Sequence, residues 1–169
     1  MRVITNSSPL IALSRIGRLD LLDKLYGEVT IPRGVAQEVI RNGIGQPGAE
    51  EVSRADWITT AQVENQQFLG TLERDLGKGE AEAIALALGL KADLLILDDL
   101  LARQVAEVLG LNVVGTVGVL LEARQKGVFG EVKRCLDDLI DLAGFRVSSE
   151  LYLRVLQEAG EETPHGSQS

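Results

Sequence analysis

Short apolar, β-branched runs alternate along the chain with longer segments in which apolar positions recur every three to four residues. The runs lie at residues 3–4, 29–31, 57–60, 94–97 and 112–114. A short apolar run is typical of a buried strand, and a 3.6-residue period is typical of a helix that packs by one face. This alternation predicts an α/β protein with three layers, α/β/α, around a central, mainly parallel five-stranded sheet.

Residues with known capping preferences mark the ends of several of these elements. Ser7 or Ser8 is expected to cap the first helix, with Pro9 in its first turn. A second helix should end at Gly27, and Pro32 should end the second strand.

The C-terminal third of the chain adds helices beyond the fifth strand. Apolar periodicity predicts them at residues 117–125, 132–142 and 149–158. The last ten residues lack such periodicity. We therefore expect a single domain over residues 1–159 and a disordered C-terminal tail over residues 160–169.

Composition favours a soluble protein of the cytoplasm. With 169 residues, 45% of them hydrophobic, the chain can bury a core without disulfide bonds. The one cysteine, Cys135, falls in a helical stretch and is expected to be a buried apolar side chain. No charged-then-apolar leader opens the sequence, and no apolar run approaches the roughly 20 residues that span a bilayer. We expect no membrane partner.

Charge limits the ways in which the chain could bind nucleic acid. The net charge of −8 opposes broad, nonspecific binding, and an aromatic content of 4% leaves few side chains on which bases could stack. Arg124, Lys126, Lys133 and Arg134 form a modest basic group. This group is either a solvated helix face or a guide for a phosphate backbone, and the sequence leaves both interpretations open.

Polar side chains follow three of the predicted strands at the point where each strand ends. Asn6 follows the first strand, Asp98 and Asp99 follow the fourth, and Thr116 follows the fifth. In a doubly wound sheet, ligands bind outside the carboxyl ends of the strands where the strand order reverses. If the fourth strand returns beside the first, Asn6 and Asp98 become neighbours at that crevice.

Further acids could reach the same crevice from the starts of helices. Glu38 is one, and Glu80 or Glu82 is another. Glu80 and Glu82 point about 200° apart on a helix, so only one of them can face the site, and we favour Glu80. Converging carboxylates repel one another unless a cation lies between them, and oxygen-only ligands suit Mg²⁺ or Mn²⁺.

Each of these acids also has a purely structural interpretation. Asp98 or Asp99 could cap the helix that follows, Glu38 could be a solvated surface acid, and Glu80 could complement a helix dipole. A serine hydrolase is disfavoured because the sole histidine, His165, lies in the tail. The order of the motifs along the chain carries more information than any single acid.

Three segments in the same order resemble PIN-domain proteins, and most closely the DUF3368 family. They lie at residues 3–13, 79–87 and 94–99, and the similarity extends over nearly the whole chain. The resemblance implies a PIN-like fold and a metal-dependent ribonuclease, often the toxin of a toxin–antitoxin pair. An RNA substrate, a small antitoxin-like protein and a possible homodimer are the partners that it implies.

The resemblance also assigns roles to residues of this chain. Catalytic acids would be Glu38, Glu80, Asp98 and Asp99. The ligands of Mg²⁺ or Mn²⁺ would be drawn from Asn6, Glu38, Glu80, Glu82, Asp98 and Asp99. Ser8 and Thr116 would contact these ligands or metal-bound water.

One position departs from the family pattern, since Asn6 stands where an acid normally follows the first strand. An amide oxygen can ligate a hard cation, but the metal site loses a full negative charge. The alternative function is therefore a catalytically impaired PIN-like module that binds nucleic acid or protein. A phosphoacceptor receiver-like domain is a weaker alternative, because no aspartate follows the third predicted strand.

Overall fold

Five parallel strands form one sheet at the centre of the computed structural model, which describes residues 1–161. They are β1 (Val3–Thr5), β2 (Val29–Pro32), β3 (Ile58–Ala61), β4 (Leu94–Ile96) and β5 (Val113–Val114). The strand order is β3-β2-β1-β4-β5, and every pairing is parallel. The predicted parallel sheet is confirmed, and the strand order reverses between β1 and β4.

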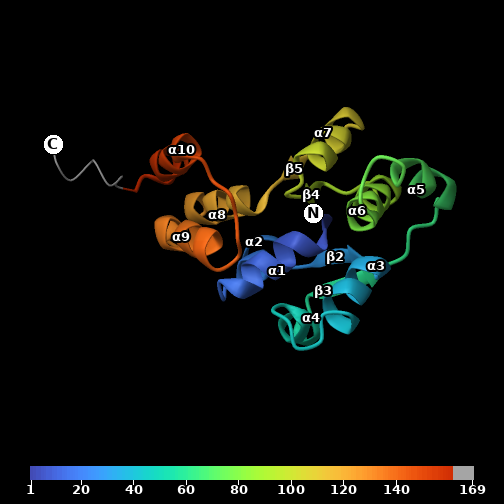
Figure 1. Ribbon diagram of the computed structural model, residues 1–169, viewed down its shortest axis with the longest axis horizontal. Coiled ribbons are helices and arrows are strands. Elements are labelled where there is room, and N and C mark those ends of the chain that lie inside the picture. Colours follow the sequence, from blue (N-terminus) through green and yellow to red (C-terminus); the bar gives the residue numbers. More distant parts are fainter. Residues whose placement is uncertain (162–169) are drawn as a thin grey trace.

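Helices cover both faces of this sheet. They are α1 (Ser7–Arg15), α2 (Asp20–Tyr26), α3 (Arg33–Ala36), the π-helical turn η1 (Gln37–Arg41), α4 (Ala49–Arg54), α5 (Gln66–Leu72), α6 (Lys78–Gly89), α7 (Leu100–Val108), α8 (Thr116–Gln125), α9 (Val132–Asp141) and α10 (Ser149–Ala159). Figure 1 shows α5, α6 and α7 together on one side, with α1, α2 and α8 to α10 on the other. The three-layer architecture follows from this arrangement.

Alternate strand residues supply the two cores that hold the layers together. Val3 and Ile96 point into the core formed with α1, α2 and α8. Ile4, Leu95 and Leu97 point into the core formed with α5, α6 and α7. Because both faces of the sheet are covered, the strands are continuous apolar runs rather than alternating ones.

The start of α1 differs from the prediction. The capping residue is Asn6, whose side chain accepts from the Ser7 backbone N–H, so neither Ser7 nor Ser8 is the cap. Asparagine and serine are about equally good caps, and the strand ends one residue before Asn6. Gly27, in contrast, ends α2 as predicted, with a positive φ of 76° that glycine adopts readily.

The C-terminal helices pack on α8 and on each other. Val132, Leu136, Val155 and Ala159 form a small third core between α9 and α10. Cys135 is buried as expected, and burial raises the pKa of its thiol. The apolar face of α10 thus serves packing within the chain.

The chain just beyond α10 also makes ordered contacts. The Glu161 carboxylate accepts from the backbone N–H groups of Val132 (2.9 Å) and Lys133 (2.7 Å), which are at the start of α9. The rest of the predicted disordered tail, residues 162–169, lies outside the described residues. None of the helices within residues 1–161 is long and apolar enough to cross a bilayer.

Candidate functional site

The strand order brings the carboxyl ends of β1 and β4 side by side, as the sequence predicted. Thr5 is in register with Ile96, and the Asn6 N–H donates to the Ile96 carbonyl at 3.3 Å. Asp98 follows β4 two residues beyond that carbonyl. The residues after β1, β4 and β5 therefore meet at one edge of the sheet, where ligands bind in folds of this kind.

Asn6, Ser7 and Glu38 form the first group of polar side chains at this edge. Asn6 and Ser7 are buried, and the Ser7 Oγ lies 3.1 Å from Asn6 Oδ1 and 3.2 Å from Glu38 Oε2. Glu38 belongs to η1, where the Asn42 N–H donates to the Gln37 carbonyl five residues earlier. Single π-helical turns of this kind occur frequently at functional sites.

Gly79, in the first turn of α6, leaves space beside this group. A Cβ atom at Gly79 would lie 3.6 Å from both Asn6 Oδ1 and Glu38 Oε2. The two oxygens therefore face the same point, and the glycine hydrogen leaves that point less filled than any other residue would.

Glu82 and Glu80 face different parts of the molecule, as the helix geometry requires. Glu82 is buried, and its Oε2 accepts from the Gly34 N–H at 3.1 Å. Burial raises the pKa of Glu82, the Glu38 charge adds to this rise, and the Gly34 N–H opposes it. Glu80, which the sequence favoured, instead has its carboxylate against Gly77, the residue that caps α6.

Asp98 and Thr116 form a second group at the same edge. Asp98 accepts from the Thr116 backbone N–H (2.7 Å) and from the Thr116 hydroxyl (2.6 Å). Asp99 has the alternative role that the sequence allowed for one member of the pair, since its Oδ1 accepts from the Ala102 N–H and caps α7. Ser8 is exposed and lines a cavity next to Asp98.

The predicted site residues are therefore distributed over two groups rather than one cluster. Within residues 1–161, no three Asp, Glu, His or Cys side chains are placed closely enough to hold a metal ion between them. The donors beside Gly79 are an amide oxygen and a carboxylate oxygen. Hard oxygen donors are the ligand type that Mg²⁺ and Mn²⁺ prefer, but this pair has only one negative charge, that of the Glu38 carboxylate.

Sequence reasoning missed the structural importance of Ser7 and Gly79. The sequence favours Ser7 as a cap over a nucleophile, although a serine that adjoins Asn6 at a strand end has the position to bridge side chains there. Gly79 enters the sequence analysis only as the first residue of the segment 79–87 that resembles PIN-domain proteins, and its placement opposite Asn6 depends on how α6 packs on β1 and β2. No local signal in the sequence reports that packing.

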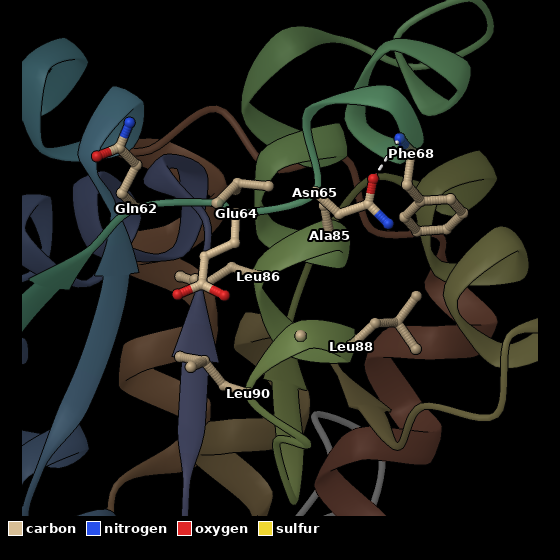
Figure 2. A pocket seen from close by; sticks show the side chains of 10 residues that line it. Gln62, Glu64, Asn65, Phe68, Ala85, Leu86, Leu88 and Leu90 are labelled. Atoms are coloured by element: carbon tan, nitrogen blue, oxygen red, sulfur yellow. Dashed lines mark hydrogen bonds between the residues drawn. The ribbon is translucent and has the colours of Figure 1, made fainter.

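A separate apolar cavity of about 390 Å³ lies at the other end of α6. Figure 2 shows Phe68, Leu88 and Leu90 among its lining side chains, with the Phe68 N–H donating to Asn65 Oδ1 at 3.0 Å. None of the predicted site residues lines it. The chemistry-bearing side chains thus gather at the N-terminal end of α6, not at this cavity.

Comparison with known families agrees with the observed fold. The profile of the family DUF3368, described as PIN domain, matches residues 2–161. No curated protein matches the chain.

Proposed function

The chain belongs to the PIN-domain family, and from this premise we propose that it is a metal-dependent endoribonuclease. Proteins of this family are generally nucleases. The proposal adds three finer points: that RNA is the substrate, that Mg²⁺ or Mn²⁺ is required, and that residues at the β1–β4 edge carry the reaction.

One observation supports the proposal most directly, namely the pair of oxygens that face Gly79. Asn6 Oδ1 and Glu38 Oε2 come from segments that follow different strands, and both point to the place that a Cβ of residue 79 would take. Oxygen donors that share an opening are the kind of set that a hard cation uses.

The side chains would divide the work of the reaction. Asn6, Glu38, Glu82 and Asp98 would hold the ion, directly or through water. A bound ion would polarise the phosphate and activate a water for attack on the phosphodiester. The Thr116 hydroxyl and N–H fix both oxygens of Asp98.

Ser7 would orient the other donors of the site. Its hydroxyl has one hydrogen and lies within hydrogen-bond distance of both Asn6 Oδ1 and Glu38 Oε2. The hydroxyl can donate to only one of these oxygens at a time, and when it donates to Glu38, Asn6 Oδ1, which already accepts from the Ser7 N–H, keeps one free lone pair. Ordered ligands of this kind reduce the reorganisation needed when a cation binds.

Cleavage of a labelled single-stranded RNA with Mn²⁺ tests the proposal. Asp98→Asn should abolish the cleavage seen with the wild-type chain, because it removes one charge while leaving an acceptor for Thr116. Asp75→Asn, at an exposed position after α5, makes the same change of charge and should cleave normally. Equal cleavage by all three proteins, or none by the wild type, would overturn it.

A second function is favoured by the low charge of the site. Asn6 replaces a carboxylate, and no three acids within residues 1–161 come close enough to share an ion. The alternative is therefore a PIN-like module that binds nucleic acid or protein without cleaving it. Cleavage by Asn6→Asp but not by the wild type would favour this alternative.

We also propose that the protein acts in the cytoplasm as a toxin that a small antitoxin-like protein restrains. This part rests on the family resemblance alone. Expression of the chain in bacteria should slow growth, and Asp98→Asn should remove this effect. Relief by a small protein encoded next to the chain would identify the partner.

A further inference from the structure

A cavity of about 550 Å³ opens beside Asp98. It lies between the start of α8, the face of α10 and the segment that precedes α10. Asp98 and Ser8 contribute to its wall. Anything bound in it would therefore adjoin the proposed reaction site.

Three arginines line this cavity, namely Arg103, Arg146 and Arg154. They come from α7, from the segment before α10 and from α10 itself. Arg103 reaches the same place as Asp98, because a Cβ at Gly115 would lie 3.1 Å from Arg103 Nη1 and 3.0 Å from Asp98 Oδ1. Segments that are distant in sequence thus bring positive charge to one opening.

Three of the cations that have no acidic partner among residues 1–161 lie together at this cavity. Of the basic group that the sequence offered, Lys126, Lys133 and Arg134 are paired with Glu122, Asp137 and Glu131, and Arg124 donates to the Ala159 carbonyl. No such ion pair involves Arg103, Arg146 or Arg154 within the described part of the chain. The chain as a whole has a net charge of −8, so three arginines around one cavity make this place unusually positive. Such a place favours an anionic ligand.

The remaining wall of the cavity is largely apolar. Phe145, Val147 and Leu151 contribute to it, and Phe145 is only partly buried. Glu158 is the one further acid on the wall besides Asp98. Guanidinium groups beside an aromatic ring are the combination that binds a nucleotide, with phosphate on the arginines and a base stacked on the ring.

We propose that this cavity binds a nucleotide of the RNA strand next to the phosphate at the reaction site. The proposal rests on the ribonuclease function proposed above, and it assigns Arg146 and Arg154 to backbone phosphates and Phe145 to a base. The local positive charge explains how a chain with a negative net charge can hold a polyanion at one place only. Arg103, which lies nearest to Asp98, would hold the phosphate closest to the reaction.

Binding of a fluorescent single-stranded RNA, measured by anisotropy in EDTA, tests the cavity without any cleavage. The Arg146→Ala/Arg154→Ala variant should bind at least roughly tenfold more weakly, and its salt dependence should be shallower by up to about 1.4 in log–log slope. The matched control is Arg54→Ala/Arg134→Ala, which removes the same charge from exposed positions of α4 and α9. It should bind within about twofold of the wild type.

The outcomes separate this inference from the proposed function. Weakened binding by the cavity variant with no cleavage by any protein would support the cavity and overturn the ribonuclease. Cleavage by the wild type with equal binding by both double variants would overturn the cavity and leave the ribonuclease in place. Binding of an acidic peptide in preference to RNA would also overturn the assignment to a nucleotide. Phe145→Leu, which keeps an apolar side chain, should weaken binding while the chain still folds.

Discussion

At the scale of single residues, Asn6 combines a structural role with a chemical one. Its Oδ1 caps α1 and also faces Gly79 beside the Glu38 carboxylate. Aspartate caps helices as well as asparagine does, so Asn6→Asp keeps the cap and adds one negative charge. We expect Mn²⁺ affinity, measured by calorimetry, to rise at least roughly tenfold, because ligand charge sets the affinity for hard cations.

Stability measurements on the same variant provide an internal check. Without metal, the new carboxylate faces Glu38, so the melting temperature should fall, and Mn²⁺ should restore it. Asn6→Ala is the control, because it should lose about 1 kcal/mol of stability with the cap and gain no affinity. Unchanged Mn²⁺ affinity in Asn6→Asp would show that Asn6 does not contact the ion.

Gly79 allows a test in which stability and metal binding move in opposite directions. The Cβ of Gly79→Ala would make ordinary contacts at 3.6 Å, so the fold should tolerate it. Alanine should also favour the helix by up to about 1 kcal/mol. The methyl group would nevertheless crowd the point that Asn6 and Glu38 share, so Mn²⁺ affinity should fall while the melting temperature holds or rises.

Gly89→Ala is the matched control for this prediction. Gly89 is in the same helix, and a Cβ there would have no neighbour within 4 Å. Its Mn²⁺ affinity should equal that of the wild type. Equal affinities for Gly79→Ala and Gly89→Ala would show that the opening beside Gly79 is not where the ion binds.

At the scale of elements, Asp98 and Asp99 show how neighbours in sequence come to have different roles. Asp99 caps α7, and Asp98 accepts two hydrogen bonds from Thr116. Asp99→Asn should keep the stability of α7, whereas Asp99→Ala should cost about 1 kcal/mol in urea unfolding. If Asp99→Asn instead lowered Mn²⁺ affinity as strongly as Asp98→Asn does, Asp99 would be a ligand and not only a cap.

The same elements show which parts of the site could be predicted from the sequence. The edge where Asn6 and Asp98 meet was predictable, because it depends only on the order of apolar runs and on the handed, parallel connections between them. The choice between Glu80 and Glu82 could not be predicted from the sequence. Helix α6 is buried on most sides, from Ala81 to Ala87, so its apolar pattern does not mark one outward face.

Short elements escaped prediction for a related reason. Helices α4 and α5 span six and seven residues, which is too short for a 3.6-residue period to stand out. The π-helical turn that carries Glu38 arises within a pattern that reads as an ordinary helix. The change to the wider hydrogen bonding of a π-helix depends on tertiary contacts rather than on local propensity. Here those contacts are with α4 and α1.

At the scale of the whole molecule, one hydrogen bond joins two helices of the same layer that are far apart in sequence. The Tyr26 hydroxyl, at the end of α2, donates to Glu122 of α8 across 96 residues of chain. Burial raises the pKa of Tyr26 well above its ordinary value of 10.0, and the bond to Glu122 raises it further. The fold therefore favours the neutral phenol.

This shift predicts how stability should change in alkaline solution. A raised pKa means that the contribution of Tyr26 is complete below the unfolded-state value of 10.0 and is lost as the pH rises above it. Tyr26→Phe should be less stable at neutral pH by about 1–2 kcal/mol, because it removes a hydrogen bond to a charged acceptor. Its melting temperature should then fall less steeply than that of the wild type between about pH 9 and pH 12.

Tyr152→Phe is the matched control for this effect. Tyr152 also donates to a carboxylate, that of Asp137, but the pair joins α10 to its neighbour α9 near the surface. Loss of that bond should leave most of the alkaline slope in place, because the contact between α2 and α8 remains. Equal slopes for the wild type and Tyr26→Phe would mean that ionisation of Tyr26 does not limit stability. The alkaline transition would then have to arise from other groups, such as Lys133, whose pKa is raised by its hydrogen bond to Asp137.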